Sequence, residues 1–257
     1  CIIIKRFRHI AHNRLADVQH HNLRGRIMKQ TINILPVFFT IFGLLLMGCG
    51  SPGSNTIRVA TDATWPPFEY LDEESQELVG LDIELMQAVA ERAGFTVEFV
   101  NVSFDTLLTG MVQCQYDAAI SAITITPERA VDFAFSDPYF EAGQVIVVRV
   151  GNIDILGPGD LVGKSVGVQR DTTGDVEAQK IEGAIIRHYD DIELAFQDLM
   201  NAQIDAVIAD NPMALGIVGT YSDLLTTVGQ TFTDENYGIA VCKSNSDLVK
   251  RINEALM

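Results

Sequence analysis

The chain has 257 residues, of which 47% are hydrophobic, so it can form one large domain or two lobes. The first 48 residues carry seven Lys and Arg and one Asp, which leaves residues 49–257 with 11 basic and 33 acidic side chains and a net charge of −22. This charge argues against nucleic acid as a partner, because phosphate binding needs a basic face.

Residues 28–48 have the pattern of a bacterial lipoprotein signal peptide. Met28 and Lys29 form a short positive start, and an apolar run without charged residues follows at residues 32–47. This run is short for a membrane-spanning helix and has the flanks of a signal peptide. An ordinary transmembrane anchor is the alternative interpretation.

The apolar run ends in Leu-Met-Gly-Cys, which places Cys49 at the position of lipidation in such signals. Residues 49–55 are rich in Gly and Ser and are expected to form a flexible tether. We therefore expect Cys49 to carry a lipid anchor. Residues 1–27 precede Met28, show no sustained apolar period and are interpreted as a non-native upstream segment.

The next part of the chain alternates between strand and helix patterns. Residues 62–80 form a polar, proline-broken loop. Strands are expected at residues 56–61, 95–100, 116–126 and 142–150. Helices are expected at residues 81–94, 103–115 and 126–133. This β-α-β-α-β order predicts an α/β lobe.

The pattern restarts after residue 160 and predicts a second α/β lobe. Strands are expected at residues 161–169, 184–189, 204–210, 225–230 and 236–243. Helices are expected at residues 172–181, 190–203, 211–221 and 246–257.

Motifs for cofactors and catalysis are absent from the sequence. A P-loop would need Gly at position 158, which is Pro158, and no GxGxxG follows a strand. His188 is the one histidine after residue 48, and Cys114 and Cys242 lack metal-ligand spacing. The sequence thus predicts no cofactor, metal or catalytic residue. The two cysteines can form a disulfide or remain free thiols.

Polar residues gather instead at strand ends and helix starts. Because ligands bind at the carboxyl edge of open α/β sheets, these residues are candidates for a binding site. They are Asp62, Ser121, Thr124, Arg129, Thr172, Thr173 and Asp210. The short helix at residues 126–133 is predicted to begin with Thr126 as its N-cap and to present Arg129. Together the set offers an anion cradle and a cation partner.

Several segments then resemble one family in order: VATDATWPPFEY, GLDIELMQAVAERAG, YDAAISAITITPERAVDFAFSDPYF, VGKSVGVQRDTTG, DAVIADNPMAL and YGIAVCKSN. They resemble the amino-acid-binding proteins of ABC importers, solute-binding protein family 3, over about residues 56–257. The resemblance implies an α/β, two-lobed periplasmic-binding-protein fold of type II with two hinge strands. Lobe 1 would comprise residues 56–142 and 236–257, and lobe 2 residues 143–235.

The resemblance also implies roles for individual residues. Arg129 would clamp the ligand α-carboxylate, which suits a guanidinium that donates two parallel hydrogen bonds. Asp210 would accept the α-ammonium group. The other residues that the resemblance places at the ligand are Asp62, Trp65, Phe104, Ser121, Ala122, Thr124, Thr172 and Thr173.

The expected function is extracytoplasmic binding of a free amino acid, without catalysis, and its delivery to an ABC permease by a monomer. Asp62 favours a ligand with a polar or basic side chain (Gln, Arg, Lys or His). The alternatives are a ligand-sensing domain of a receptor and a periplasmic prephenate or arogenate dehydratase, for which Asp62 is the candidate acid.

The sequence departs from the family pattern at three places, one of which is Cys242, where Pro is common. Cys114 stands where a glycine usually ends the preceding helix, so that turn is expected to be strained or differently capped. The chain also stops at Met257 inside a helix that continues in the family. We therefore expect a truncated C-terminal helix.

Overall fold

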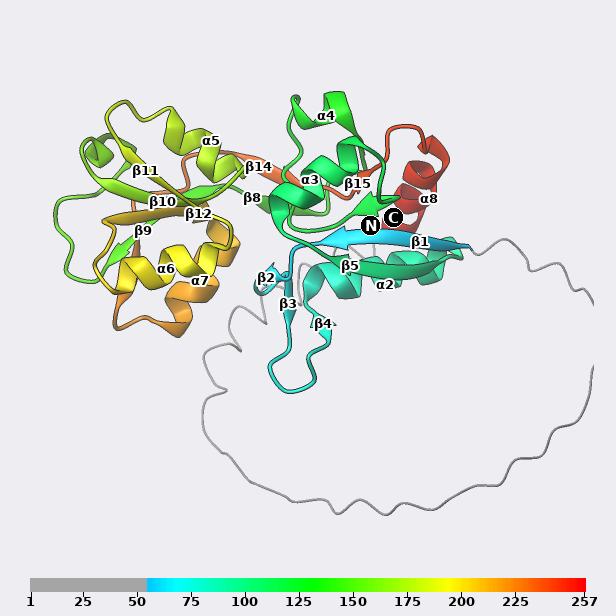
Figure 1. Ribbon diagram of the computed structural model, residues 1–257, viewed down its shortest axis with the longest axis horizontal. Helices are drawn as coiled ribbons and strands as arrows, with labels where there is room; N and C mark the ends of the chain where they lie inside the picture. The colour runs from blue at the N-terminus through cyan, green and yellow to red at the C-terminus, as the bar shows by residue number, and fades with distance from the viewer. Residues whose placement is uncertain (1–54) are drawn as a thin grey trace, which may run out of the picture.

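The computed structural model describes residues 55–257, which form two α/β lobes side by side (Figure 1). The upstream segment expected at residues 1–27, the signal peptide expected at residues 28–48 and the lipidation expected at Cys49 lie outside the described residues. Among residues 55–257, no helix is long and apolar enough to cross a membrane.

The sheet of lobe 1 has the strand order β5-β1-β6-β15-β7. Its strands are β1 (Thr56–Thr61), β5 (Thr96–Asn101), β6 (Ala118–Ala119), β7 (Ala134–Phe135) and β15 (Ala240–Val241). β1 pairs in parallel with β5 and β6, whereas β15 runs antiparallel to β6 and β7. The last part of the chain therefore returns to the first lobe.

Helices cover both faces of this sheet. They are α2 (Leu81–Ala93), α3 (Phe104–Val112), α4 (Arg129–Asp132) and α8 (Ser246–Leu256). The apolar side of α2 packs with α8 into one hydrophobic cluster, while α3 packs into a second cluster with Ala60 and Phe133. α2 ends as predicted at Gly94, whose φ of 73° provides a left-handed cap.

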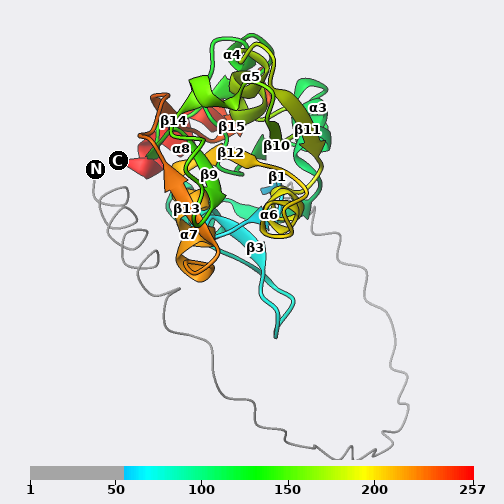
Figure 2. The same cartoon turned by 90° about the vertical axis from the view of Figure 1, so that its left-hand side faces the viewer.

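Lobe 2 contains a second five-stranded sheet with the order β11-β10-β12-β9-β13. Its strands are β9 (Gln144–Arg149), β10 (Ser165–Gln169), β11 (Ile185–Tyr189), β12 (Ala206–Asp210) and β13 (Leu225–Val228). Its helices are the 3-10 helix η1 (Pro158–Leu161), α5 (Thr173–Gln179), α6 (Ile192–Met200) and α7 (Asn211–Thr220). α5 lies on one face of the sheet and α6 and α7 on the other (Figure 2).

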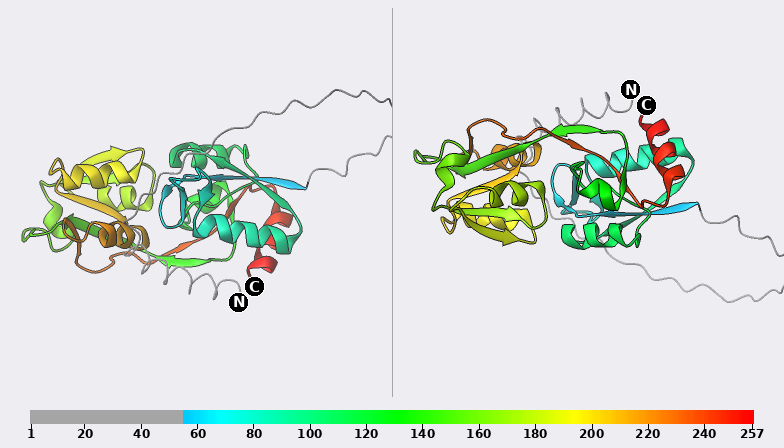
Figure 3. Two further views of the ribbon diagram at one scale, coloured as in Figure 1. Left: turned by 90° about the horizontal axis from the view of Figure 1, so that it is seen from below. Right: turned by 90° about the horizontal axis from the view of Figure 1, so that it is seen from above.

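Two antiparallel strands connect the lobes, β8 (Phe140–Ala142) and β14 (Glu235–Tyr237). They run side by side between the lobes in both views of Figure 3. The Tyr237 ring is fully buried and stacks on Phe140 with 5.8 Å between ring centroids. This arrangement confirms the predicted two-lobed α/β architecture with two hinge strands.

Several predicted elements differ from the structure. The strand expected at residues 116–126 is reduced to β6, because Ala122 adopts a φ of 45° and turns the chain away from the sheet. The strand expected at residues 236–243 divides into β14 and β15. The polar loop at residues 62–80 contains a small sheet, formed by β2 (Thr64–Trp65), β3 (Glu69–Leu71) and β4 (Leu78–Val79).

The short helix α4 begins at Arg129, later than predicted, and its N-cap is Glu128. Thr126 nevertheless keeps a capping role, since its hydroxyl accepts a hydrogen bond of 3.2 Å from the Arg129 backbone N–H. The turn before α4 therefore still fixes the direction of the Arg129 backbone.

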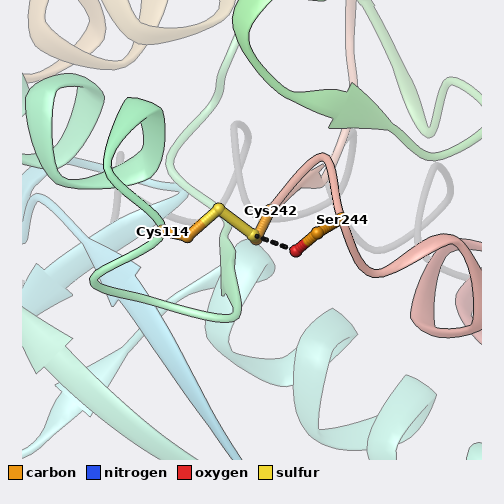
Figure 4. The surroundings of a disulfide bond; sticks show 3 residues. All are labelled: Cys114, Cys242 and Ser244. Carbon is orange, nitrogen blue, oxygen red and sulfur yellow. Dashed lines mark hydrogen bonds between the residues drawn. A yellow bond between two sulfur atoms is a disulfide. The ribbon is translucent and has the colours of Figure 1, made fainter.

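A disulfide joins Cys114 and Cys242, whose Cα atoms lie 5.1 Å apart (Figure 4). It connects the turn after α3 with the segment that follows β15, both in lobe 1. Cys114 has a φ of 52°, a left-handed conformation that favours glycine. The open question about the two cysteines is thus resolved by a covalent link within one lobe.

Candidate ligand-binding site

A cleft lies between the lobes. It is lined by the ten candidate residues from the sequence, Asp62, Trp65, Phe104, Ser121, Ala122, Thr124, Arg129, Thr172, Thr173 and Asp210. Two further lining residues, Glu69 and Gln169, were not predicted. The fold therefore gathers all of the candidates at one place.

Arg129 is held in the cleft by three contacts. Its guanidinium donates hydrogen bonds to the backbone oxygen of Thr124 at 2.9 Å and to that of Asp171, in lobe 2, at 3.0 Å. It also lies over the Phe104 ring, with 5.4 Å between Cζ and the ring centroid. Burial lowers the pKa of Arg129, and nearby carboxylates oppose this effect. Within residues 55–257, the side chain is positioned without a carboxylate ion pair.

In the loop after β6, several polar groups already form hydrogen bonds within the protein, and other atoms can contact a ligand. The Ser121 hydroxyl donates to Glu69 Oε1 at 2.9 Å and accepts from the Asp62 backbone N–H at 3.0 Å. The Ala122 N–H donates to Asp82 Oδ2 at 2.7 Å. Since that N–H is occupied, Ala122 can meet a ligand through its carbonyl or methyl group.

The threonines of lobe 2 are tied into the protein through their hydroxyl groups. Thr172 is the N-cap of α5 and accepts from the Asp175 N–H at 3.2 Å. The Thr173 hydroxyl donates to Glu235 Oε2 at 2.8 Å. Both residues thereby fix the start of α5 at the edge of the cleft.

Asp210 ends β12 and is held by one residue of β9 and one of the hinge strand β14. Gln144 donates to its Oδ1 at 2.6 Å and the Tyr237 hydroxyl donates to its Oδ2 at 2.5 Å. Burial, and then the charge of Glu235, raise the pKa of Asp210 to about 6. The carboxylate is thus oriented by lobe 2 and by the hinge together.

Asp62 follows β1 and bonds to both lobes. Its Oδ1 accepts from the Thr64 hydroxyl at 3.0 Å, and its Oδ2 accepts from Gln169 of lobe 2 at 2.9 Å. Burial raises the pKa of Asp62 to about 6, although these hydrogen bonds partly offset the effect. Together with the Arg129–Asp171 bond, the Asp62–Gln169 bond describes a closed arrangement of the lobes.

Charge distinguishes the cleft from an ordinary apolar pocket. The carboxyl groups of Asp62, Glu69 and Asp210 line it, against the single guanidinium of Arg129. The aromatic rings of Trp65 and Phe104 complete the walls. Such a site favours a ligand with one anionic group and more than one cationic group.

Metal ligands are not grouped in this part of the chain. Among residues 55–257, no set of three or more His, Cys, Asp and Glu side chains could hold a metal ion. His188 lies away from the cleft and bonds to Asp175 Oδ1 at 2.9 Å.

Residues 57–257 match the family described as bacterial extracellular solute-binding proteins, family 3. The chain belongs to this family. The L-cystine-binding protein TcyJ of Escherichia coli (strain K12) is 32% identical over 204 residues, which cover 79% of this chain and 76% of TcyJ. ABC transporter arginine-binding protein 1 of Escherichia coli (strain K12) is 32% identical over 214 residues, which cover 80% of this chain and 86% of that protein.

Several solved structures of amino-acid-binding proteins are also similar. An ancestral arginine-binding protein bound to arginine is 44% identical, with a TM-score of 0.76 and coverage of 79% of this chain and 91% of that one. An ancestral amino acid-binding protein, AncCDT-1, described as a precursor of cyclohexadienyl dehydratase, is 34% identical. Its TM-score is 0.73, and the match covers 79% of this chain and 88% of that one.

Two residues that line the cleft, Gln169 and Glu69, were not predicted, and the reasons differ. Gln169 ends β10, so the strand-end rule that selected Asp62 and Asp210 would also have selected it. Glu69 belongs to β3, inside a segment interpreted as a polar loop. Its neighbours Glu73 and Glu74 are exposed acidic residues of the same segment, and the sequence does not distinguish them.

Proposed function

We propose that the protein binds a free amino acid with a positively charged side chain, arginine in first place, and delivers it to an ABC importer. The observation that carries this proposal is the excess of buried carboxyl groups over guanidinium in the cleft. The carboxylate of a zwitterionic ligand can pair with Arg129, and the ammonium group of the same ligand can pair with Asp210. The negative charge of Asp62 then remains for a cationic side chain.

The zwitterionic part of the ligand would be held between the lobes. Arg129 belongs to lobe 1, and Asp210 belongs to lobe 2, so both ends of the ligand are satisfied together when the lobes are closed. Thr124 and Thr173 flank this position and face each other at 3.5 Å between their hydroxyl oxygens. Binding energy is therefore available to favour closure.

The side-chain end would lie near Asp62, Trp65 and Gln169. An indole face attracts a guanidinium or ammonium group by a cation–π interaction, and a buried carboxylate adds charge. The arginine bound to the similar ancestral protein supports this assignment. Lys and His are the next candidates on charge, and Gln on polarity.

The setting proposed for the protein is extracytoplasmic, with a lipid anchor on Cys49 and a monomeric binding unit. The Cys114–Cys242 disulfide supports an oxidising compartment. We place the lobe boundaries at residues 142/143, directly after the hinge strand β8, and at 235/236, within the hinge strand β14.

A dehydratase function is less well supported by the geometry. Such an enzyme needs a carboxylic acid that can protonate a leaving hydroxyl group. Both oxygens of Asp62 are already engaged, one by Thr64 and the other by Gln169. This environment suits recognition of a cation better than proton donation.

Isothermal titration calorimetry with the twenty amino acids tests the proposal. We expect arginine to bind most tightly and, at ~100 times its Kd, to stabilise the protein by about 2.7 kcal/mol in thermal unfolding. Absence of binding by every amino acid would contradict the proposal. Incubation with prephenate, followed by absorbance, separates the dehydratase alternative, for which turnover is expected.

Asp62→Asn tests the side-chain end alone. Asn keeps an oxygen for Gln169 but loses the charge, so we expect the affinity ratio of arginine to glutamine to fall about tenfold. Asp223→Asn, at an exposed position in lobe 2, is the matched control. An unchanged ratio would remove Asp62 from the recognition of a cation.

A further inference from the structure

Glu69 and Asp82 form a buried pair of carboxyl groups beneath the cleft, and neither residue has any exposed surface. Glu69 Oε1 accepts from the Ser121 hydroxyl at 2.9 Å. Asp82 Oδ2 accepts from the Ala122 N–H at 2.7 Å and from the Tyr139 hydroxyl at 2.8 Å. Within residues 55–257, no salt bridge involves either carboxyl group.

The remaining oxygens of the pair lack partners among the described residues. Glu69 Oε2 and Asp82 Oδ1 are buried there without a hydrogen-bond partner, and the Asp82 backbone N–H donates to the Phe68 backbone oxygen at 2.9 Å, next to Glu69. Ionised carboxylates only accept hydrogen bonds, so one proton between these two carboxyl groups would supply the missing donor. Burial, and then the charge of Asp82, raise the pKa of Glu69 well above its ordinary value, while burial raises that of Asp82 to about 6.

The pair is connected to the ligand site through Glu69, which lines the cleft. The groups that face it are Ser121, Tyr139, Ala122 and, from the loop after β1, the charged Asp62. Gln169, which approaches Asp62 from lobe 2, is neutral. Among the residues that line the cleft in the described part of the chain, Arg129 is the one cation, and it faces the opposite end of the proposed ligand. A positive charge brought into this part of the cleft would therefore meet carboxyl groups.

We propose that Glu69 and Asp82 share a single proton in the absence of ligand, and that a cationic ligand side chain displaces this proton on binding. The proton passes to the buffer, and the charge of the ligand replaces it as the partner of the second carboxylate. No bond other than the O–H bond is broken. This inference rests on the proposed function, because it needs a ligand with a charged side chain in the cleft.

The test is calorimetric titration of arginine and of glutamine at neutral pH in buffers that differ in ionisation enthalpy. Both ligands carry the same α-carboxylate and α-ammonium groups, so the comparison isolates the side chain. For arginine, we expect release that approaches one proton per ligand bound. For glutamine, we expect an enthalpy that does not depend on the buffer.

Two variants locate the source of the proton. Glu69→Gln mimics the protonated acid, and Asp82→Asn can donate to an ionised Glu69, so neither has a shared proton to release. We expect each to abolish the buffer dependence for arginine, whereas Glu74→Gln, at an exposed position in the same segment, keeps it. Release that persists in both variants, or arginine binding by the wild-type protein without release, would overturn the proposal.

A second measurement does not depend on a ligand. The carbon-13 resonance of the Glu69 carboxyl group, assigned by its loss in Glu69→Gln, reports its protonation at neutral pH. We expect the shift of a protonated or proton-sharing acid. A carbon-13 chemical shift typical of an ionised carboxylate would overturn the proposal of a shared proton. Failure of every amino acid to bind would instead contradict the proposed function.

Discussion

Thr173 donates a hydrogen bond of 2.8 Å to Oε2 of Glu235, and the same oxygen accepts one of 2.8 Å from Thr124. Thr173 begins α5 of lobe 2, Thr124 lies in lobe 1, and Glu235 begins the hinge strand β14. One carboxylate in the hinge therefore bonds to both lobes. Its other oxygen accepts from Gln144 at 3.2 Å and from Thr233 at 2.7 Å.

Replacement of Glu235 by alanine should favour the open arrangement. The variant loses the acceptor that both threonines share in the closed arrangement. We expect the apparent affinity to fall about tenfold for every amino acid that binds, because the closed state is less populated. Small-angle X-ray scattering without ligand should show a larger radius of gyration than that of the wild-type protein.

Glu182→Ala provides the control, since Glu182 is an exposed carboxylate of lobe 2 that does not line the cleft. It should leave both the radius and the affinity unchanged. Equal radii for the wild-type protein and Glu235→Ala would show that the carboxylate does not set the balance between open and closed lobes.

Arg129→Lys should remove most ligand binding without unfolding the protein. Lysine keeps the positive charge but cannot make the two directed bonds to Thr124 and Asp171 while it also clamps a carboxylate. We expect a loss of affinity of about 100-fold, measured by calorimetry, with a nearly unchanged melting temperature. Arg92→Lys, on the exposed side of α2, should bind normally. Retained affinity in Arg129→Lys would show that another group holds the carboxylate.

Ligand affinity should depend on the ionisation of Asp210. Burial raises its pKa from 3.8 to about 6, and only the ionised form can pair with an α-ammonium group. We expect affinity to fall about tenfold per pH unit below about pH 6 when this group dominates. Calorimetry across this range checks the trend, and a flat profile would contradict the assigned role.

The same shift acts on stability with the opposite sign. Asp210 holds its proton more tightly in the folded than in the unfolded chain, so its protonation stabilises the fold. This contribution is full below about pH 4 and is lost as the pH rises through about 6. Relative to Asp210→Asn, the wild-type protein without ligand should therefore gain melting temperature on acidification. If the difference in melting temperature between the two proteins does not change with pH, the raised pKa of Asp210 is contradicted.

Loss of the disulfide should destabilise the protein and spare the site. We expect replacement of Cys114 and Cys242 by serine to lower the free energy of unfolding by about 2–5 kcal/mol. Ligand affinity should stay within about twofold, because the disulfide lies outside the residues that line the cleft. Urea unfolding and calorimetry measure the two quantities. Wild-type protein with reductant should reproduce the variant, and a large loss of affinity would contradict this separation.

Periodic patterns predicted the long elements well. Helices α2 and α6 carry regular apolar faces, and strands such as β10 and β12 are buried runs. The segment at residues 116–126 failed because its β-rich composition continues past the point where Ala122 adopts a left-handed conformation. Backbone turns of this kind depend on tertiary contacts, here on the bond from Ala122 to Asp82.

Part of the candidate site could be predicted, because some positions in the sequence indicate a position in the fold. Strand ends and helix starts meet at one edge of an α/β sheet, so Asp62 and Asp210 could be selected by rule. Glu69, Asp82 and Glu235 could not, since their importance comes from burial and from partners that are distant in the sequence. The residue type alone does not indicate whether a glutamate side chain is buried.

The link between Cys114 and Cys242 also has a topological consequence. Lobe 2 lies between the two cysteines in the sequence. The disulfide and the chain between the cysteines therefore form one covalent ring, and all of lobe 2 is part of this ring. A peptide bond cut in an exposed loop of that lobe, such as the one around Ile153, would leave both fragments attached. Strand β15 and helix α8 would stay beside their partners in lobe 1. Outside the cell, where proteases act on surface loops, the first lobe would thus survive damage to the second.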